Sequence, residues 1–121
     1  MYWTAEEMRN YQRTAVRRQQ AERQQAAQRR ARAWELARQA AATLKAEFGV
    51  ERVMVFGSLT QADRFTQWSD IDLAVWGLND QNWLKAIGAV HYLGEITINV
   101  VDVGCCAESK LVIMESEGVE L

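Results

Sequence analysis

The pattern of apolar and polar residues divides the chain near Gly49. Residues 4–48 contain no proline and no glycine, and Ala, Gln, Arg and Glu dominate this segment. These residues are strong helix formers, and a glycine just past the last helical residue is a common stop. The segment therefore predicts one long helix, about 65 Å from end to end at the usual rise per residue. We interpret 1–48 as a helical interaction arm and 49–121 as the folded domain.

The two halves of this predicted helix differ in what they can bury. Between residues 17 and 32, alanine is the only apolar residue, so this stretch offers little surface for packing. At the tip, large apolar side chains are exposed unless a partner covers them. Nearer the domain, apolar residues recur every three or four positions and predict a stripe that packs on the domain. The tip residues are Tyr2, Trp3, Met8 and Tyr11, and the stripe is Trp34, Ala37, Ala41, Leu44 and Phe48.

After residue 49 the pattern changes to short apolar runs separated by glycines. The runs at 52–56, 71–76 and 96–103 predict strands, whereas 80–90 and 108–116 predict helices. Strands that alternate with helices indicate an α/β (α+β) layer structure with a small, mostly buried sheet.

Charge is distributed unevenly over the two parts. Residues 1–48 carry ten Arg and Lys against five acids, whereas 49–121 carry four against eleven, within a net charge of −2. Such asymmetry is typical of an interaction arm on a differently charged body. No apolar run reaches about 18 residues, and the first residues lack an apolar signal core, so we expect a cytoplasmic protein without a membrane segment. The adjacent Cys105 and Cys106 are interpreted as reduced thiols.

Two acids flank one apolar residue at the start of the second predicted strand. Because successive strand residues point to opposite faces, Asp70 and Asp72 project together while Ile71 enters the core. Paired carboxylates repel each other unless a cation neutralises them, and such hard oxygen ligands suit Mg²⁺. The pattern predicts a metal site, and the alternative is a solvated strand end with two acids of no special role.

Two further features bear on this choice. Gly57 and Ser58 directly follow the first strand, where a glycine admits close approach of a ligand and free N–H groups can hold phosphate oxygens. Asp102 lies in an otherwise apolar strand, where an ionised side chain needs a partner or a metal. Together they predict a phosphate-binding turn beside a cation site. Asp102 would be the third carboxylate of this site, where it either helps to hold two ions or accepts a proton from an attacking hydroxyl. The alternatives are an ordinary turn at Gly57 and an exposed strand end at Asp102.

The order of these motifs resembles the signature of the DNA polymerase β superfamily, and more narrowly that of the minimal nucleotidyltransferases (MNT). Eleven residues separate Ser58 from Asp70, and Asp102 matches the position of the family's third acid. The resemblance covers residues 50–121 and implies a polymerase-β-type fold, with a small mixed sheet packed by helices. It also implies transfer of AMP from ATP with two Mg²⁺ ions and release of pyrophosphate. The implied metal-binding and catalytic residues are Asp70, Asp72 and Asp102, and the implied nucleotide-binding residues are Gly57 and Ser58.

The resemblance also implies a partner. Minimal members typically pair with a HEPN-domain ribonuclease in bacterial and archaeal toxin–antitoxin modules, so we expect an antitoxin that modifies a tyrosine of the toxin with AMP. Residues 59–65 depart from the basic pattern that many relatives have at this point, and Arg64 is the candidate for a contact with the triphosphate. His91 is the only histidine and is interpreted as structural or exposed.

Two other classes of function stay open. An inactive nucleotidyltransferase fold would neutralise a toxin by contact alone, with the long helix as the grip, although the intact acids argue against this. Alternatively, the Arg-rich helix would follow the phosphates of a nucleic acid. Interleaved glutamines and the acidic body favour a solvated or protein-binding arm, so we predict no direct binding of nucleic acid.

Overall fold

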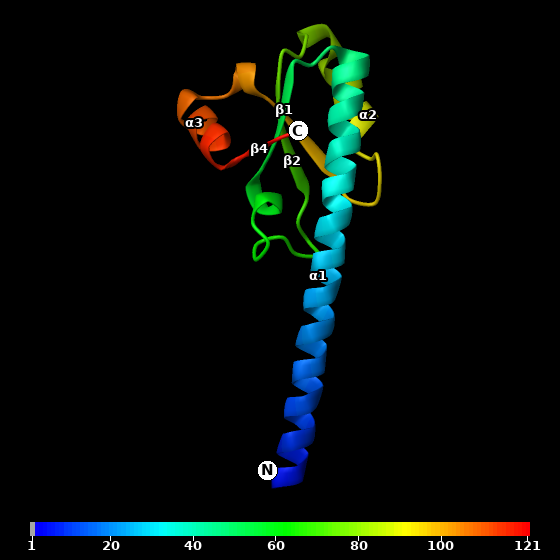
Figure 1. The fold of residues 1–121 in the computed structure, drawn as a ribbon, viewed down its shortest axis with the longest axis vertical. Helices are drawn as coiled ribbons and strands as arrows, with labels where there is room; N and C mark the ends of the chain where they lie inside the picture. The colour runs from blue at the N-terminus through cyan, green and yellow to red at the C-terminus, as the bar shows by residue number, and fades with distance from the viewer. Residues whose placement is uncertain (1) are drawn as a thin grey trace.

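The chain folds as a four-stranded sheet with a long helix that crosses one face and projects far beyond it (Figure 1). The structure is a computed structural model that describes residues 2–121. Its helices are α1 (Ala5–Phe48), α2 (Trp83–Val90) and α3 (Glu108–Glu117), with short 3-10 turns at η1 (Gly57–Thr60), η2 (Asp80–Asn82) and η3 (Val103–Cys105). Its strands are β1 (Arg52–Phe56), β2 (Ile71–Trp76), β3 (Ile98–Asp102) and β4 (Val119–Glu120).

The ends of α1 follow from local chemistry. The Thr4 side chain accepts a hydrogen bond from the backbone N–H of Glu7, which satisfies one of the free donors of the first turn. At the other end Gly49 takes a left-handed conformation with φ 64°, which is unstrained only for glycine. The predicted helix is confirmed over its whole length.

The buried face of α1 is wider than the predicted stripe. Ala37, Ala41 and Leu44 are buried as expected, whereas Trp34 and Phe48 are only partly buried at the margin of the core. Leu36, which the predicted stripe lacks, is fully buried. A helix that lies flat on a sheet buries a broad stripe, and this one contains Ala33, Leu36, Ala37, Ala40, Ala41 and Leu44.

The strands form one mixed sheet in the order β3-β2-β1-β4. β1 pairs antiparallel with β2 and β4, whereas β2 and β3 are parallel. The strands predicted at 52–56 and 71–76 are confirmed residue for residue, and β3 is shorter than the predicted 96–103. β4 has only two residues and pairs with Met54 and Val55, so it is too short to leave a periodic signal in the sequence.

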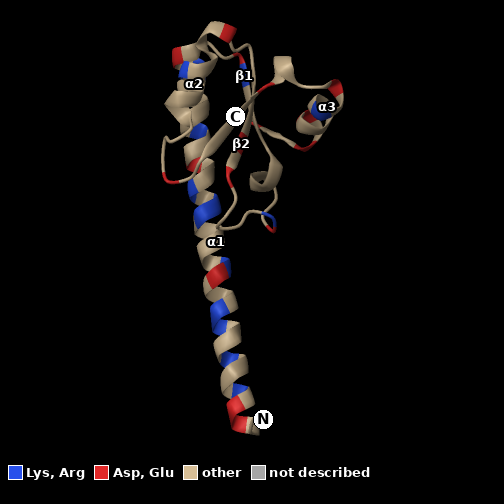
Figure 2. Cartoon of the chain, turned by 180° about the vertical axis from the view of Figure 1, so that it is seen from behind, with Lys and Arg blue, Asp and Glu red and all other residues tan. Residues whose placement is uncertain are grey.

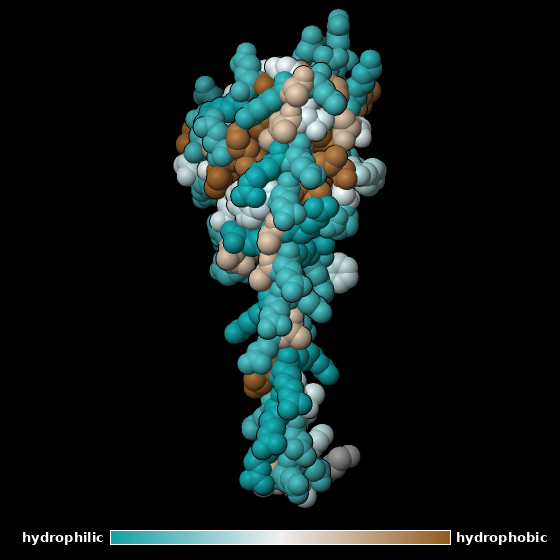
Figure 3. All heavy atoms as spheres, turned by 45° about the vertical axis from the view of Figure 1, so that its right-hand side comes forward, coloured by the Kyte–Doolittle hydropathy of each residue, from teal (hydrophilic) through white to brown (hydrophobic). Residues whose placement is uncertain are grey.

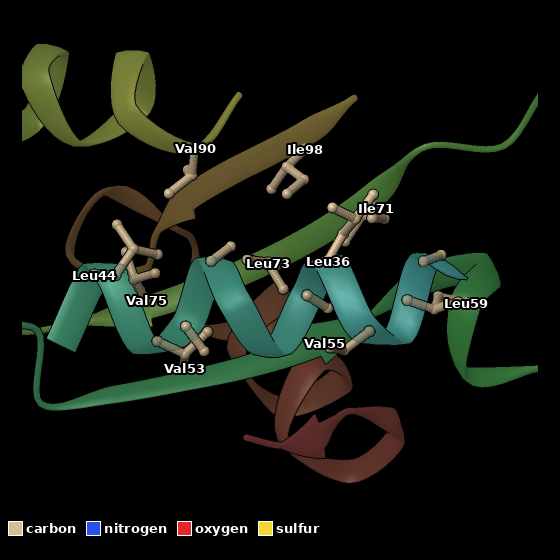
Figure 4. Packing of buried hydrophobic residues seen from close by; sticks show 14 of the residues in the cluster. Leu36, Leu44, Val53, Val55, Leu59, Ile71, Leu73, Val75, Val90 and Ile98 are labelled. Atoms are coloured by element: carbon tan, nitrogen blue, oxygen red, sulfur yellow. The ribbon is translucent and has the colours of Figure 1, made fainter. Parts of the chain in front are cut away.

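The two faces of the sheet have different coverings. α1 and α2 cover one face, where Leu36, Val53, Leu73, Val75 and Ile98 form part of the main core (Figure 4). α3 lies on the other face in Figure 1, where a smaller cluster forms around Ala74, Val103 and Met114. The expected α/β (α+β) layer structure is thereby confirmed.

The first 27 described residues, 2–28, form a projecting segment that we call the arm. Figure 3 shows it as a largely hydrophilic rod, and Figure 2 shows basic residues along it, all of them arginines in this segment, with acids at its tip. Its large apolar side chains are exposed, including Trp3 at 55% and Tyr11 at 62%. From Ala33 onward the same helix belongs to the core, so the packed body does not begin at residue 49 but includes the second half of α1.

The remaining reactive side chains have structural or surface positions. His91 is half-buried, and its Nδ1 lies 2.8 Å from the carbonyl oxygen of Ile98, which ties the end of α2 to β3. Cys105 and Cys106 are free thiols, as predicted. No helix within residues 2–121 is both long enough and apolar enough to cross a membrane.

Candidate functional site

The glycine–serine turn and Asp72 lie side by side. β1 ends at Phe56, which pairs with Asp72 across the sheet, and the chain then turns sharply at Gly57 with φ 76°. A Cβ atom at Gly57 would lie 2.9 Å from the Asp72 Oδ2, closer than real contacts allow. Only glycine therefore permits both this backbone conformation and this approach, and Ser58 follows as the first residue beyond the close contact.

Asp70 and Asp72 share one end of β2 but differ in environment. Asp70 is exposed just before the strand, whereas Asp72 is half-buried within it. Burial raises the pKa of the Asp72 carboxyl, and the negative charge of Asp70 adds to the rise, while a hydrogen bond from Asn99 acts in the opposite direction. The ionised pair therefore carries an electrostatic cost, which a bound cation would relieve.

The structure does not bring Asp102 to the other two acids. β3 pairs with β2 so that Asn99 lies opposite Asp72, whereas Asp102 lies opposite Val75. Because side chains alternate between the faces of a sheet, Asp102 is on the face of Val75, and Asp72 is on the other face. Its Oδ1 instead accepts a hydrogen bond of 3.0 Å from the backbone N–H of Gly104.

Contrary to the expectation, Asp102 does not lie with Asp70 and Asp72 as the third acid of one site. Among the residues described, 2–121, no three His, Cys, Asp or Glu side chains converge so that they could hold one metal ion. Asp102 instead lines a separate pocket of about 420 Å³ together with Asp80, Trp83 and Cys105. A charged residue in a strand can join a metal site only when the strand register places it near the other ligands and its side chain lies on the same face of the sheet.

Asn99 is the residue that the sequence analysis missed. It lies beside Asp72 on the same face of the sheet, and its Nδ2 donates a hydrogen bond of 3.3 Å to the Asp72 Oδ1. The signal available in the sequence was Asn99 itself, an amide residue that shares the apolar run 96–103 with Asp102. Choosing between Asn99 and Asp102 requires the register between β2 and β3. The sequence of one strand does not determine that register.

Two arginines of α1 hold the loop that joins η1 to β2. Arg29 donates to the carbonyl oxygens of Thr66, at 3.2 Å, and Ser69, at 2.9 Å. Arg30 donates to the carbonyl oxygen of Leu59 at 3.1 Å. Because Ser69 directly precedes Asp70 and Leu59 directly follows Ser58, the long helix fixes both ends of the segment that joins the two halves of the candidate site.

The same loop borders the arm. A groove of about 1170 Å³ lies between α1 and the loop, with Arg23 and Trp34 on the helix side and Trp68 on the loop side. The Trp68 side chain is 84% exposed and lies two residues before Asp70. Arg64 is exposed in the same loop, and its contact with a triphosphate stays a prediction.

Comparison with solved structures identifies the fold. A chain in the crystal structure of a mutant of the toxin–antitoxin complex MntA-HpeT matches with a TM-score of 0.57 and 20% sequence identity, covering 69% of this chain and 69% of that chain. No family model and no curated protein matches the chain. MntA has a nucleotidyltransferase fold, so the expected fold class is confirmed.

The close contact at Gly57 leads to a prediction. We expect Gly57→Ala to lower the free energy of unfolding by about 1–2 kcal/mol, because alanine is strained at positive φ. The added methyl group would also displace the Asp72 carboxylate, so we expect weaker binding of ATP. Urea denaturation and titration calorimetry measure the two effects.

Gly88→Ala is the matched control, because Gly88 lies inside α2 and a Cβ there meets nothing within 4 Å. We expect it to be neutral or stabilising by about 0.5–1 kcal/mol and to leave ATP binding unchanged. Equal stability and equal ATP affinity for Gly57→Ala and the wild type would contradict the proposed role of this turn.

Proposed function

We propose that this protein is a nucleotidyltransferase that transfers AMP from ATP to a protein partner, and that it acts as the antitoxin of a HEPN-domain ribonuclease toxin by modifying a tyrosine. The observation that carries the proposal is the close approach of the Gly57 turn to Asp72, next to Asp70. It supports the binding of phosphate beside the two carboxylates. The similarity to a chain of a toxin–antitoxin complex supports the choice of partner.

The side chains at this site fit one Mg²⁺ ion. Asp70 and Asp72 supply two carboxylates, which is the usual protein contribution to a magnesium site that also takes phosphate oxygens. When bound, Mg²⁺ supplies positive charge that neutralises the triphosphate and polarises its phosphorus–oxygen bonds. Gly57 leaves room for the Asp72 carboxylate to approach the turn. The backbone and hydroxyl of Ser58 would hold the phosphates beside the acids.

The proposed transfer exchanges one phosphorus–oxygen bond for another. The oxygen of the acceptor hydroxyl forms a bond to the α-phosphorus of ATP, and the bond from this phosphorus to the bridging oxygen breaks. Pyrophosphate leaves with the electron pair of the broken bond, and the hydroxyl proton passes to water. Asn99 cannot accept this proton, because an amide is not basic at neutral pH.

We propose that the arm and the adjacent groove hold the protein acceptor. Trp3, Met8, Tyr11 and Val16 expose apolar surface along the arm, and Trp68 does so next to the acids. Arg23 and its neighbours make the arm basic, which suits an acidic surface on the partner. Exposed aromatic residues beside arginines are typical of protein-binding surfaces.

The test is a transfer assay with purified components. We expect the HEPN-domain partner to become labelled when it is mixed with this protein, Mg²⁺ and ATP labelled at the α-phosphate, and to stay unlabelled with ATP labelled at the γ-phosphate. The α-label identifies transfer of AMP, and the γ-label controls for phosphorylation. A stable complex without α-label on the partner would refute transfer.

Neutralisation of the toxin by contact alone is the second candidate function. Asn99 favours it, because this amide stands beside Asp72 where a third carboxylate would assist transfer. The two candidates differ in their need for ATP. Contact alone would inhibit the ribonuclease without ATP and would leave its tyrosines unmodified, whereas transfer requires ATP and persists after this protein is removed.

A further inference from the structure

We infer that Asn99 occupies the position from which a third carboxylate would complete the cation site, and that it restricts the site to one divalent ion held by Asp70 and Asp72. This inference rests on the proposed function, because it concerns the same site. It adds the number of ions that the site accepts and the residue that sets this number.

The register between β2 and β3 selects Asn99. The two strands are parallel neighbours in which Asp72 pairs with Asn99, and paired residues of adjacent strands lie about 5 Å apart. The Asp72 carboxylate and the Asn99 amide are on the same face and in contact at 3.3 Å. Since asparagine and aspartate have the same shape, a carboxylate at this position would place its oxygens beside those of Asp72.

The chemistry of the amide limits what the site can bind. Asn99 turns an N–H donor toward Asp72, and a donor cannot coordinate a cation. If the Asn99 amide rotated to face Asp72 with its oxygen, this oxygen would be neutral. The site would still have one negative charge fewer than a site with three carboxylates. Asp70 and Asp72 together carry two negative charges, which one divalent ion balances. A second ion would be held by the triphosphate alone, because among residues 2–121 no further carboxylate joins this pair to bind it.

Asn99 also keeps the electrostatic cost of the metal-free site lower than a third carboxylate would. A third carboxylate here would be forced against Asp72, and like charges on paired strand residues are destabilising. The amide replaces this repulsion by a hydrogen bond. The resulting site holds a nucleotide through one ion but lacks the charge that would favour attack by the acceptor, so the transfer is slower than three acids would allow.

The experiment counts bound ions, so it does not depend on activity. Mn²⁺ is titrated into the protein with a non-hydrolysable ATP analogue, and free Mn²⁺ is measured by electron paramagnetic resonance. Free analogue and its ions equilibrate across a dialysis membrane, so only the ions that are retained with the protein are counted. We expect one retained ion for the wild type and two for Asn99→Asp. We also expect Asn99→Asp to have a lower melting temperature than the wild type in EDTA. Added Mn²⁺ should raise the melting temperature of Asn99→Asp more than that of the wild type. Transfer by Asn99→Asp should be faster by about 100-fold.

Two further variants keep the test decisive if Asn99→Asp folds poorly. Asn99→Ala should keep one ion, because Asn99 is not a ligand; loss of the ion would overturn the inference. Asp102→Asn keeps the hydrogen-bond acceptor for Gly104 and should also keep one ion. Two ions in the wild type, or one ion in a folded Asn99→Asp, would overturn this inference but would leave the proposed function standing. No ion in the wild type would instead refute the proposed function.

Discussion

Asp72→Asn should lower the rate of AMP transfer to the partner by about 1,000-fold or more, and Asp70→Asn should do the same. Each change removes one of the two charges that would hold Mg²⁺ beside the Gly57 turn, and within residues 2–121 no third carboxylate converges with them to replace it. Initial rates with ATP labelled at the α-phosphate measure the loss. Transfer at the wild-type rate by either variant would show that the metal site lies elsewhere.

The same Asp72→Asn variant should be more stable than the wild type when no divalent ion is present. Burial, together with the charge of Asp70, raises the pKa of Asp72, so the native state binds this proton more tightly than the unfolded state. Between the ordinary carboxyl pKa of about 4 and the raised value, the stability of the wild type therefore falls as pH rises. Asp72→Asn lacks this fall, so its advantage in the free energy of unfolding over the wild type is largest at neutral pH.

Urea denaturation in EDTA from acid to neutral pH measures this difference. A more stable but inactive variant excludes misfolding as the cause of the lost transfer, and Asp102→Asn serves as the control that should keep full transfer. Equal stability of Asp72→Asn and the wild type at every pH would contradict the electrostatic description of the site.

Removing the apolar side chains of the arm should abolish the stable complex with the partner. We expect the triple variant Trp3→Ser, Met8→Ser and Tyr11→Ser to weaken binding by about 1,000-fold, because the two aromatic residues would contribute about 2 kcal/mol each as anchors of an interface. Calorimetry with the HEPN-domain partner measures the affinity. Binding of ATP should not change, since these residues lie on the projecting part of α1.

A matched control changes exposed apolar residues on the packed body instead. Leu84 on α2 and Val112 on α3 are 79% and 65% exposed, so their replacement by serine costs little stability. We expect the variant with both replacements to bind the partner like the wild type. If the arm variant binds equally well, the acceptor is held by another surface.

Local chemistry was sufficient to predict α1 and the strands β1 and β2. α1 begins at a capping threonine and ends at Gly49, and the strands at 52–56 and 71–76 are apolar runs bounded by turn residues. The proximity of Gly57 to Asp72 follows from the antiparallel pairing of β1 and β2, which brings the end of one strand to the start of the next. These features depend on residues that are close in sequence or on side-chain alternation.

The sequence by itself thus determined the helix, the strands and the pair of acids beside the glycine–serine turn. The tertiary structure alone decided that Asn99, and not Asp102, lies against Asp72, because the register of parallel strands depends on how the connection through α2 packs. It also decided that Arg29 and Arg30 hold the loop before Asp70, since these contacts join residues at least 29 positions apart. No local pattern encodes a contact of that range, because it forms only when α1 settles on the sheet.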